Sequence, residues 1–63
     1  MRSEIYVGRA HALKGKTALV QDDPMSTTNL VLAQFDDKEL VWDGNQMGFG
    51  WHSFYAHEFE SIQ

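Results

Sequence analysis

The chain contains no cysteine, and this absence removes several kinds of stabilisation and chemistry at once. Disulfides, thiolate zinc sites and cysteine nucleophiles are excluded, and a reducing compartment is the expected location. A domain of about 60 residues buries only about 60% of the surface of its unfolded chain, so its stability is marginal without cross-links. The 63 residues therefore predict a single domain, residues 1–63, that depends on its apolar core and on any self-association.

Basic residues and long apolar runs are also scarce. Five Lys and Arg against nine Asp and Glu give a net charge of -4, which is the wrong sign for binding a phosphate backbone. No apolar run approaches the ~20 residues that span a bilayer, and the first residues lack the apolar stretch of a secretory signal. We therefore expect a cytoplasmic protein with no membrane partner.

The residues that are present indicate an all-β fold. Hydrophobic residues make up 43% of the chain and recur with a period near two, which is typical of strands. The expected strands cover residues 4–7, 17–20, 30–35, 39–42 and 51–54, and residues 46–50 are expected to form a bent or bulged strand. Turns are expected at Gly15, at residues 36–38 and at Asp43-Gly44.

The last residues predict a different element. Residues 55–62 are too few for a stable helix, so we expect a single 3₁₀ turn there, with Phe59 pointing back to the core. Short strands with frequent turns in so small a chain favour a five-stranded barrel, in which closure protects the strand edges. Such a barrel is expected to leave no room for a ligand cleft of about 300–1,000 Å³.

In spacing and turn chemistry the chain resembles SH3-like barrels of the KOW and Tudor kind. The resemblance rests on the Gly-centred turn in residues 13–20, on the apolar strand and acidic turn in 30–37, and on the apolar spacing of 50–62. It implies a five-stranded SH3-like barrel that ends in a 3₁₀ turn and a closing strand. Tyr55 stands where SH3 domains have a Pro, and Glu58 where they have a Tyr, so binding of Pro-rich peptides is not implied. The acidic charge likewise separates the chain from KOW modules, which are commonly basic.

Neither a metal site nor a catalytic site is predicted. His52 and His57 lie near Glu58 and Glu60 in the sequence, and imidazole and carboxylate groups can bind zinc. The spacing of the two histidines, however, matches one face of neither a helix nor a strand. Ser53 cannot face His52 on a strand, because successive side chains point to opposite faces. We therefore expect no metal, no cofactor and no enzymatic activity.

Aromatic and acidic residues give the clearest indication of function. The rings crowd into the C-terminal third, where so small a barrel cannot enclose all of them. Exposed Trp and Tyr side chains are frequent anchors of protein interfaces, and an acidic surface attracts a basic partner. The expected protein-binding residues are Trp42, Trp51, Tyr55, Asp36 and Asp37. We therefore predict a non-enzymatic module that binds another protein, with a homo-oligomer as a further possibility.

The alternative function is nucleic-acid binding. The basic residues near the start of the chain would contact phosphates, and Tyr6 or Trp51 would stack on bases. These basic residues are Arg9, His11, Lys14 and Lys16. A chain this short also resembles the accessory proteins that bacteriophages and mobile elements encode, in which case a protein in the host cytoplasm would be the target.

Overall fold

The computed structural model describes residues 1–25, 29–42 and 44–62 of the chain. They form the strands β1 (Arg2–Tyr6), β2 (Thr17–Asp22), β3 (Leu30–Phe35), β4 (Val41–Trp42), β5 (Asn45–Gln46), β6 (His52–Tyr55) and β7 (Phe59–Ser61). A 3₁₀ turn, η1 (Ala56–Glu58), joins β6 to β7. The all-β fold and the 3₁₀ turn near the C-terminus, both expected from the sequence, are confirmed.

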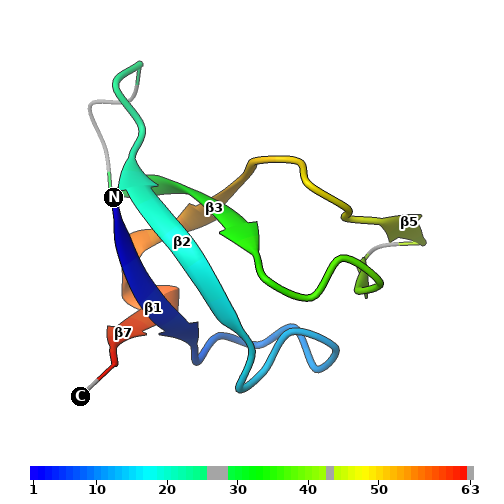
Figure 1. Ribbon diagram of the computed structural model, residues 1–63. Coiled ribbons are helices and arrows are strands. Elements are labelled where there is room, and N and C mark those ends of the chain that lie inside the picture. Colours follow the sequence, from blue (N-terminus) through cyan, green and yellow to red (C-terminus); the bar gives the residue numbers. More distant parts are fainter. Residues whose placement is uncertain (26–28, 43, 63) are drawn as a thin grey trace.

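The principal strands form a five-stranded antiparallel sheet in the order β6-β3-β2-β1-β7. The sheet curls into a half-barrel, and η1 connects one edge strand to the other (Figure 1). Two backbone hydrogen bonds hold this connection: Val7 N–H donates to the Glu58 carbonyl (2.7 Å), and Ala56 N–H donates to the Asn29 carbonyl (2.7 Å). Strands β4 and β5 form a separate hairpin that extends beyond one end of the sheet (Figure 1).

Agreement with the expected strands is best where the apolar run is continuous. Strand β3 has the predicted bounds, Leu30–Phe35, because polar loops on both sides leave little freedom in where it begins and ends. The bent strand expected at residues 46–50 is wrong. Only its first residue pairs, and the chain then turns, with Gly48 at a φ of +57° and Gly50 N–H donating to the Met47 carbonyl (3.1 Å). A positive φ ends a strand, because the pleated backbone requires negative φ values.

The predicted turn at Asp43-Gly44 is only partly visible, since Asp43 lies outside the described residues. Gly44 has a φ of +79°, which suits a tight hairpin turn, and β4 pairs with β5 on either side of it.

The core lies on the inner face of the half-barrel. Alternate residues of β2 and β3 are buried there, as the period of two predicts. The buried side chains are Tyr6, Leu13, Ala18, Val20, Val31, Ala33, Phe35, Leu40, Met47, Phe54 and Phe59. Four of these rings, from Tyr6, Phe35, Phe54 and Phe59, contact one another with centroids 5.5 to 6.1 Å apart. The prediction that Phe59 points to the core is confirmed.

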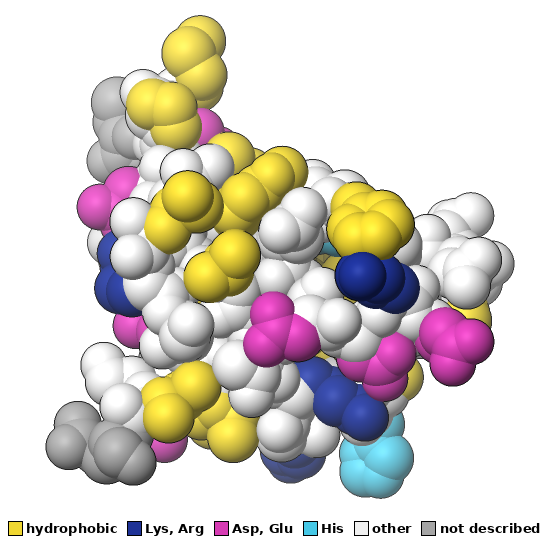
Figure 2. Space-filling model, viewed as in Figure 1, with side chains coloured by type: hydrophobic (Ala, Val, Ile, Leu, Met, Phe, Trp, Pro, Cys, Tyr) yellow, Lys and Arg dark blue, Asp and Glu magenta, His cyan; other side chains and the backbone are white. Residues whose placement is uncertain are grey.

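The outer face of the sheet carries the intervening residues of the same strands. Leu19, Leu30 and Leu32 are half-buried there, although no other layer covers them within the described chain. Hydrophobic side chains gather over β2 and β3 on the side that faces the viewer in Figure 2. Both faces of this part of the sheet are therefore apolar.

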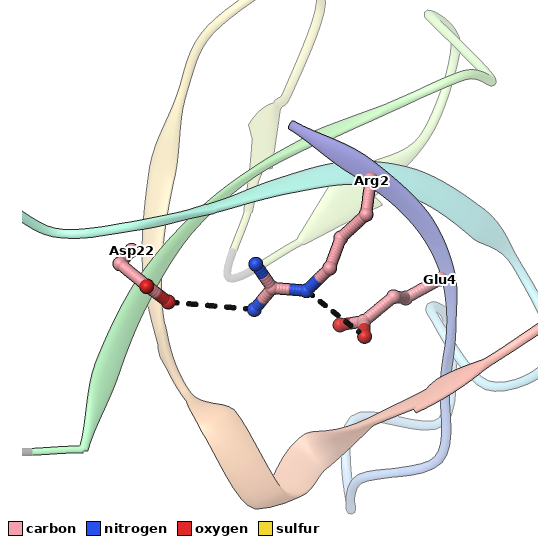
Figure 3. Close-up of polar contacts among 3 residues, drawn as sticks. All are labelled: Arg2, Glu4 and Asp22. Carbon is pink, nitrogen blue, oxygen red and sulfur yellow. Dashed lines mark hydrogen bonds and ion pairs between the residues drawn. The ribbon is translucent and has the colours of Figure 1, made fainter.

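Charged residues of the strands gather at one end of the inner face. Arg2 Nε donates to Glu4 Oε2 (3.1 Å), and Arg2 Nη2 donates to Asp22 Oδ1 (3.4 Å) (Figure 3). Glu4 lies opposite the buried Ala18, and Arg2 lies opposite Val20, so both charges share the face of the core. The Arg2 guanidinium lies between the two carboxylates, so its positive charge compensates the negative charges of Glu4 and Asp22 at this end of the inner face.

Among the described residues, the longest helical stretch is the three-residue η1, so no helix reaches the length and apolarity of a membrane span.

The aromatic core predicts a large effect of truncating one of its rings. Phe35 is 3% exposed and contacts the other three rings, so Phe35→Ala is expected to lower the free energy of unfolding by about 3–5 kcal/mol. Phe49→Ala is the matched control, because Phe49 is 67% exposed; the expected loss is about 1 kcal/mol or less. Urea denaturation followed by tryptophan fluorescence measures both, and equal losses would contradict this account of the core.

Candidate functional site

A surface groove of about 520 Å³ opens between η1 and the loop that follows β1, residues 7–16, here called the first loop. Its lining consists of Val7, Gly8, Arg9, Lys14, Tyr55, His57 and Glu58. Ligand sites commonly occupy about 300–1,000 Å³, so the expectation that this fold leaves no room for such a cleft is wrong. The groove lies between two surface segments, whereas the expectation considered only the interior of the barrel, which core side chains fill.

The first loop keeps a defined shape because its backbone bonds to the end of β1. Tyr6 N–H donates to the Lys16 carbonyl (2.9 Å), and Gly15 N–H donates to the Tyr6 carbonyl (3.0 Å). The fully buried Leu13 anchors the loop in the core. The predicted turn at Gly15 is confirmed, with a φ of +82° that glycine adopts without steric cost. The basic side chains of the loop are therefore presented from a fixed backbone.

Hydrogen bonds to Glu58 stabilise η1, which forms the opposite wall of the groove. Glu58 Oε2 accepts from Tyr55 N–H (2.9 Å), and its Oε1 accepts from the hydroxyl of Tyr6 (2.9 Å). Its carbonyl accepts from Val7 N–H (2.7 Å). Both carboxylate oxygens are thus engaged by the chain itself, and Glu58 links η1 to β1.

The Tyr6 hydroxyl connects the two walls. It donates to Glu58 and accepts from Ala10 N–H (3.1 Å), while the side chain as a whole is only 2% exposed. Burial raises the pKa of Tyr6, and the bond to Glu58 adds to this shift, because both favour the neutral phenol.

Gly8 forms the floor where the walls meet. A Cβ atom at this position would collide with the Tyr6 hydroxyl and would lie 2.6 Å from Glu58 Oε1. Contacts this short force a side chain or the backbone to move, so the Tyr6–Glu58 bond requires glycine here.

The exposed surface of the groove combines positive charge with a flat aromatic surface. Arg9 and Lys14 project from the first loop and are exposed. From the other wall, the rings of Tyr55 and His57 stack with centroids 5.5 Å apart and an interplanar angle of 15°. Tyr55 is 56% exposed. The arrangement can attract an anionic group electrostatically and offer a ring for apolar contact.

The structure brings together residues from both functional predictions. Tyr55 was expected in a protein interface, and Arg9 and Lys14 in a nucleic-acid interface, yet all three line one groove. Trp51 is 38% exposed but lies immediately before β6, beyond the opposite end of that strand from Tyr55. Trp42 is half-buried, with its ring 5.1 Å from that of Phe54, and it does not line the groove.

The acidic residues of the prediction lie outside the groove. Asp36 and Asp37 are exposed in the turn after β3. Asp37 Oδ1 accepts from Glu39 N–H (3.0 Å), and its Oδ2 lies 3.6 Å from Lys16 Nζ. Lys16 is therefore directed to this turn. His11, the remaining basic residue of the alternative, is exposed in the first loop without lining the groove.

The two candidate histidines make separate contacts. His52 Nε2 lies 3.5 Å from the Met47 carbonyl, and His57 stacks on Tyr55. Within residues 1–25, 29–42 and 44–62, no group of three or more His, Asp or Glu side chains could hold a metal ion.

Sequence reasoning missed Gly8 and the structural role of Glu58. Both depend on the bond between Tyr6 and Glu58, which are 52 positions apart. A local pattern carries no signal for such a contact. The acidic residue in the 3₁₀ turn was the available cue, because an acidic side chain there can accept from the backbone N–H that precedes the turn.

Comparison of the chain with protein-family models, with curated proteins and with solved structures gives no match in any of the three.

The close approach at Gly8 predicts a cost for adding one methyl group. Gly8→Ala is expected to lower the free energy of unfolding by about 1–3 kcal/mol, because the Tyr6–Glu58 bond must shift. Gly50→Ala is the matched control: its nearest neighbour would be the tip of the His52 side chain, at 3.2 Å, which can rotate away. Urea denaturation compares the two variants, and an equal or larger loss in Gly50→Ala would argue against the packing described at Gly8.

The raised pKa of Tyr6 predicts alkaline destabilisation. In the unfolded chain the Tyr6 phenol ionises at about pH 10, whereas in the folded protein the phenol keeps its proton to higher pH. Its contribution is therefore complete below about pH 10 and is lost as the pH rises through the folded pKa. Tyr6→Phe should be less stable than the wild type by about 1–3 kcal/mol at pH 8, and this gap should narrow by pH 11. Urea denaturation at pH 8, 10 and 11 measures the gap, and a constant value would refute the prediction.

Proposed function

We propose that the protein is a small non-enzymatic module that holds an acidic segment of a partner protein in the groove between the first loop and η1. The observation that supports this most directly is the meeting of Arg9, Lys14 and the exposed ring of Tyr55 in one groove. The proposal retains the predicted protein partner and the aromatic anchor. It replaces the acidic surface at Asp36 and Asp37 by a basic one.

The charge and shape of the groove suit an extended peptide. Two cations beside a ring match a carboxylate next to an apolar side chain, and Tyr and Arg are frequent anchors in protein interfaces. The rigid backbone of the first loop, held by Leu13, lowers the entropic cost of binding.

The chemistry of the groove favours binding over catalysis. The carboxylate that lines it, on Glu58, accepts two internal hydrogen bonds and holds the walls together. A general acid or base must reach the substrate, and these bonds turn both oxygens of Glu58 toward the chain.

The resemblance to SH3-like barrels supports the same site. The Gly-centred turn at Gly15 and the closing 3₁₀ turn were the features that carried this resemblance, and the segments that contain them form the two walls of the groove. With Tyr55 and Glu58 in place of the Pro and Tyr of SH3 domains, an acidic peptide is the proposed ligand class, and not a Pro-rich one.

Nucleic-acid binding is the second candidate, because Arg9, Lys14 and the Tyr55 ring also match a phosphate beside a stacked base. Lys16 pairs with Asp37, His11 lies outside the groove, and the chain carries a net charge of -4. These features leave few cations for successive phosphates and favour the peptide.

The peptide proposal is tested with a defined probe. A fluorescently labelled peptide of about ten residues, roughly 30 Å when extended, carries two Glu residues around a Leu and is compared with its Gln counterpart. Fluorescence anisotropy should show binding of the Glu peptide, and Tyr55→Ala and Lys14→Glu should each weaken it by about tenfold or more.

Lys38→Glu is the matched control for Lys14→Glu, since it makes the same charge change outside the groove. Lys38 lies over the ring of Phe49, 4.4 Å from its centroid. The proposal fails if the Glu and Gln peptides bind equally, or if Lys38→Glu weakens binding as much as Lys14→Glu. A labelled single-stranded oligonucleotide that binds more tightly, with an affinity that falls steeply with salt, would instead establish the second candidate.

A further inference from the structure

The basic side chains of this chain differ in whether the chain itself engages their charge. Of the five Lys and Arg residues, those that contact a carboxylate or a ring are Arg2, Lys16 and Lys38. Arg9 and Lys14 line the groove, and within residues 1–25, 29–42 and 44–62 no carboxylate lies at ion-pair distance from either side chain. The positive charge of the groove is therefore left for a bound anion to neutralise.

His57 is a third basic side chain of the same groove. It lies on η1, is exposed, and stacks on the ring of Tyr55 with an interplanar angle of 15°. Stacking uses the face of the imidazole, whereas its two nitrogens lie in the plane of the ring. In the part of the chain that the structure describes, neither nitrogen has a hydrogen-bond or ion-pair partner. Both nitrogens are therefore free to contact a ligand.

We infer that His57 is a binding residue of the groove and takes up a proton when the acidic segment binds. The inference rests on the proposed function and adds a pH dependence to it. Histidine is the residue type whose charge ordinarily changes between about pH 5 and pH 8. The affinity for the acidic segment should therefore rise as the pH falls through this range.

The two cations of the first loop couple proton uptake to binding. Arg9 and Lys14 line the groove with His57, so in the free protein their charges oppose a third positive charge there. A bound carboxylate offsets the two charges and can accept a hydrogen bond from the imidazolium. Both effects favour the protonated form of His57 in the complex over the free protein.

The other groups around His57 do not oppose this change. A cation within about 6 Å of a Tyr ring is attracted by the face of that ring, and the Tyr55 centroid lies 5.5 Å from that of His57. The Glu58 carboxylate favours the imidazolium, but it already accepts from Tyr55 N–H and Tyr6, so it is present with or without a ligand. Glu60, on β7, does not line the groove.

Proton uptake and binding are linked reciprocally, and this fixes the sign of the effect. The gain in affinity is complete at a pH below the titration of His57 in the free protein. It is lost as the pH rises through the titration of His57 in the complex. The Glu side chains of the peptide probe, which ionise near about pH 4.3, stay charged throughout. We expect binding to be about three- to tenfold tighter at about pH 6 than at about pH 8.

The test is fluorescence anisotropy with the Glu peptide and its Gln counterpart at both pH values, using a label whose emission does not change over this range. The rise should be seen with the Glu peptide alone. His57→Gln should abolish it, because an amide forms hydrogen bonds but takes up no proton. His11→Gln is the matched control: His11 is exposed in the first loop outside the groove, so this variant should keep the full rise.

A second measurement covers the case in which His57→Gln disturbs η1. The imidazole C–H signals of the three histidines are followed by NMR against pH, with and without the Glu peptide. The titration midpoint of His57 should move to higher pH when the peptide is bound. The midpoints of His11 and His52, which lie outside the groove, should stay constant.

The inference is overturned if the Glu peptide binds equally at both pH values, or if the His57 midpoint does not move. It is also overturned if His57→Gln keeps the rise or if His11→Gln loses it. In each of these cases binding of the Glu peptide at about pH 8 leaves the proposed function standing. Absence of binding at both pH values would instead refute the proposed function, and this inference with it.

Discussion

The buried hydroxyl of Tyr6 is the constraint on which the junction of β1, the first loop and η1 depends. A phenol placed among the rings of Phe35, Phe54 and Phe59 needs hydrogen-bond partners, because a buried polar group without them costs free energy. It donates to Glu58 and accepts from Ala10 N–H. One side chain thereby joins β1, the first loop and η1. The groove is the outer surface of that junction, so core packing and the candidate site share the same bond.

The groove and the outer face of the sheet differ in physical character, although Tyr55 belongs to both. The groove combines the cations Arg9 and Lys14 with an exposed ring, Tyr55, which suits the proposed acidic segment of another protein. The outer face of the sheet is apolar around Leu19 and Leu32 and carries Glu60 at its β7 edge. Among the charged strand residues, Arg2, Glu4 and Asp22 lie on the inner face of the sheet, and Glu60 lies on the outer face.

Local sequence patterns predicted the secondary-structure elements more accurately than the roles of individual side chains. The apolar run at Leu30–Phe35, the glycine turn at Gly15 and the short 3₁₀ turn all follow from residue spacing and backbone preference, and the structure confirms them. The prediction of a bent strand at residues 46–50 is wrong because glycines fit a bulge and a turn equally well. Only the presence of a pairing strand decides between the two. The aromatic residues were grouped by their sequence proximity, yet Trp42 packs on the core while Tyr55 lies in the groove.

The sequence by itself determined an all-β chain with an apolar core, without cysteine chemistry and with an acidic net charge. These properties depend on composition and on contacts between near neighbours, which alternation and turn residues encode directly. Only the tertiary structure decided that Arg9 and Lys14 line one groove with Tyr55, that Gly8 must lack a side chain, and that Arg2 and Glu4 lie on the inner face of the sheet. Each of these depends on contacts between distant segments, whose geometry is set by the curl of the whole sheet and by the Tyr6–Glu58 bond that closes it.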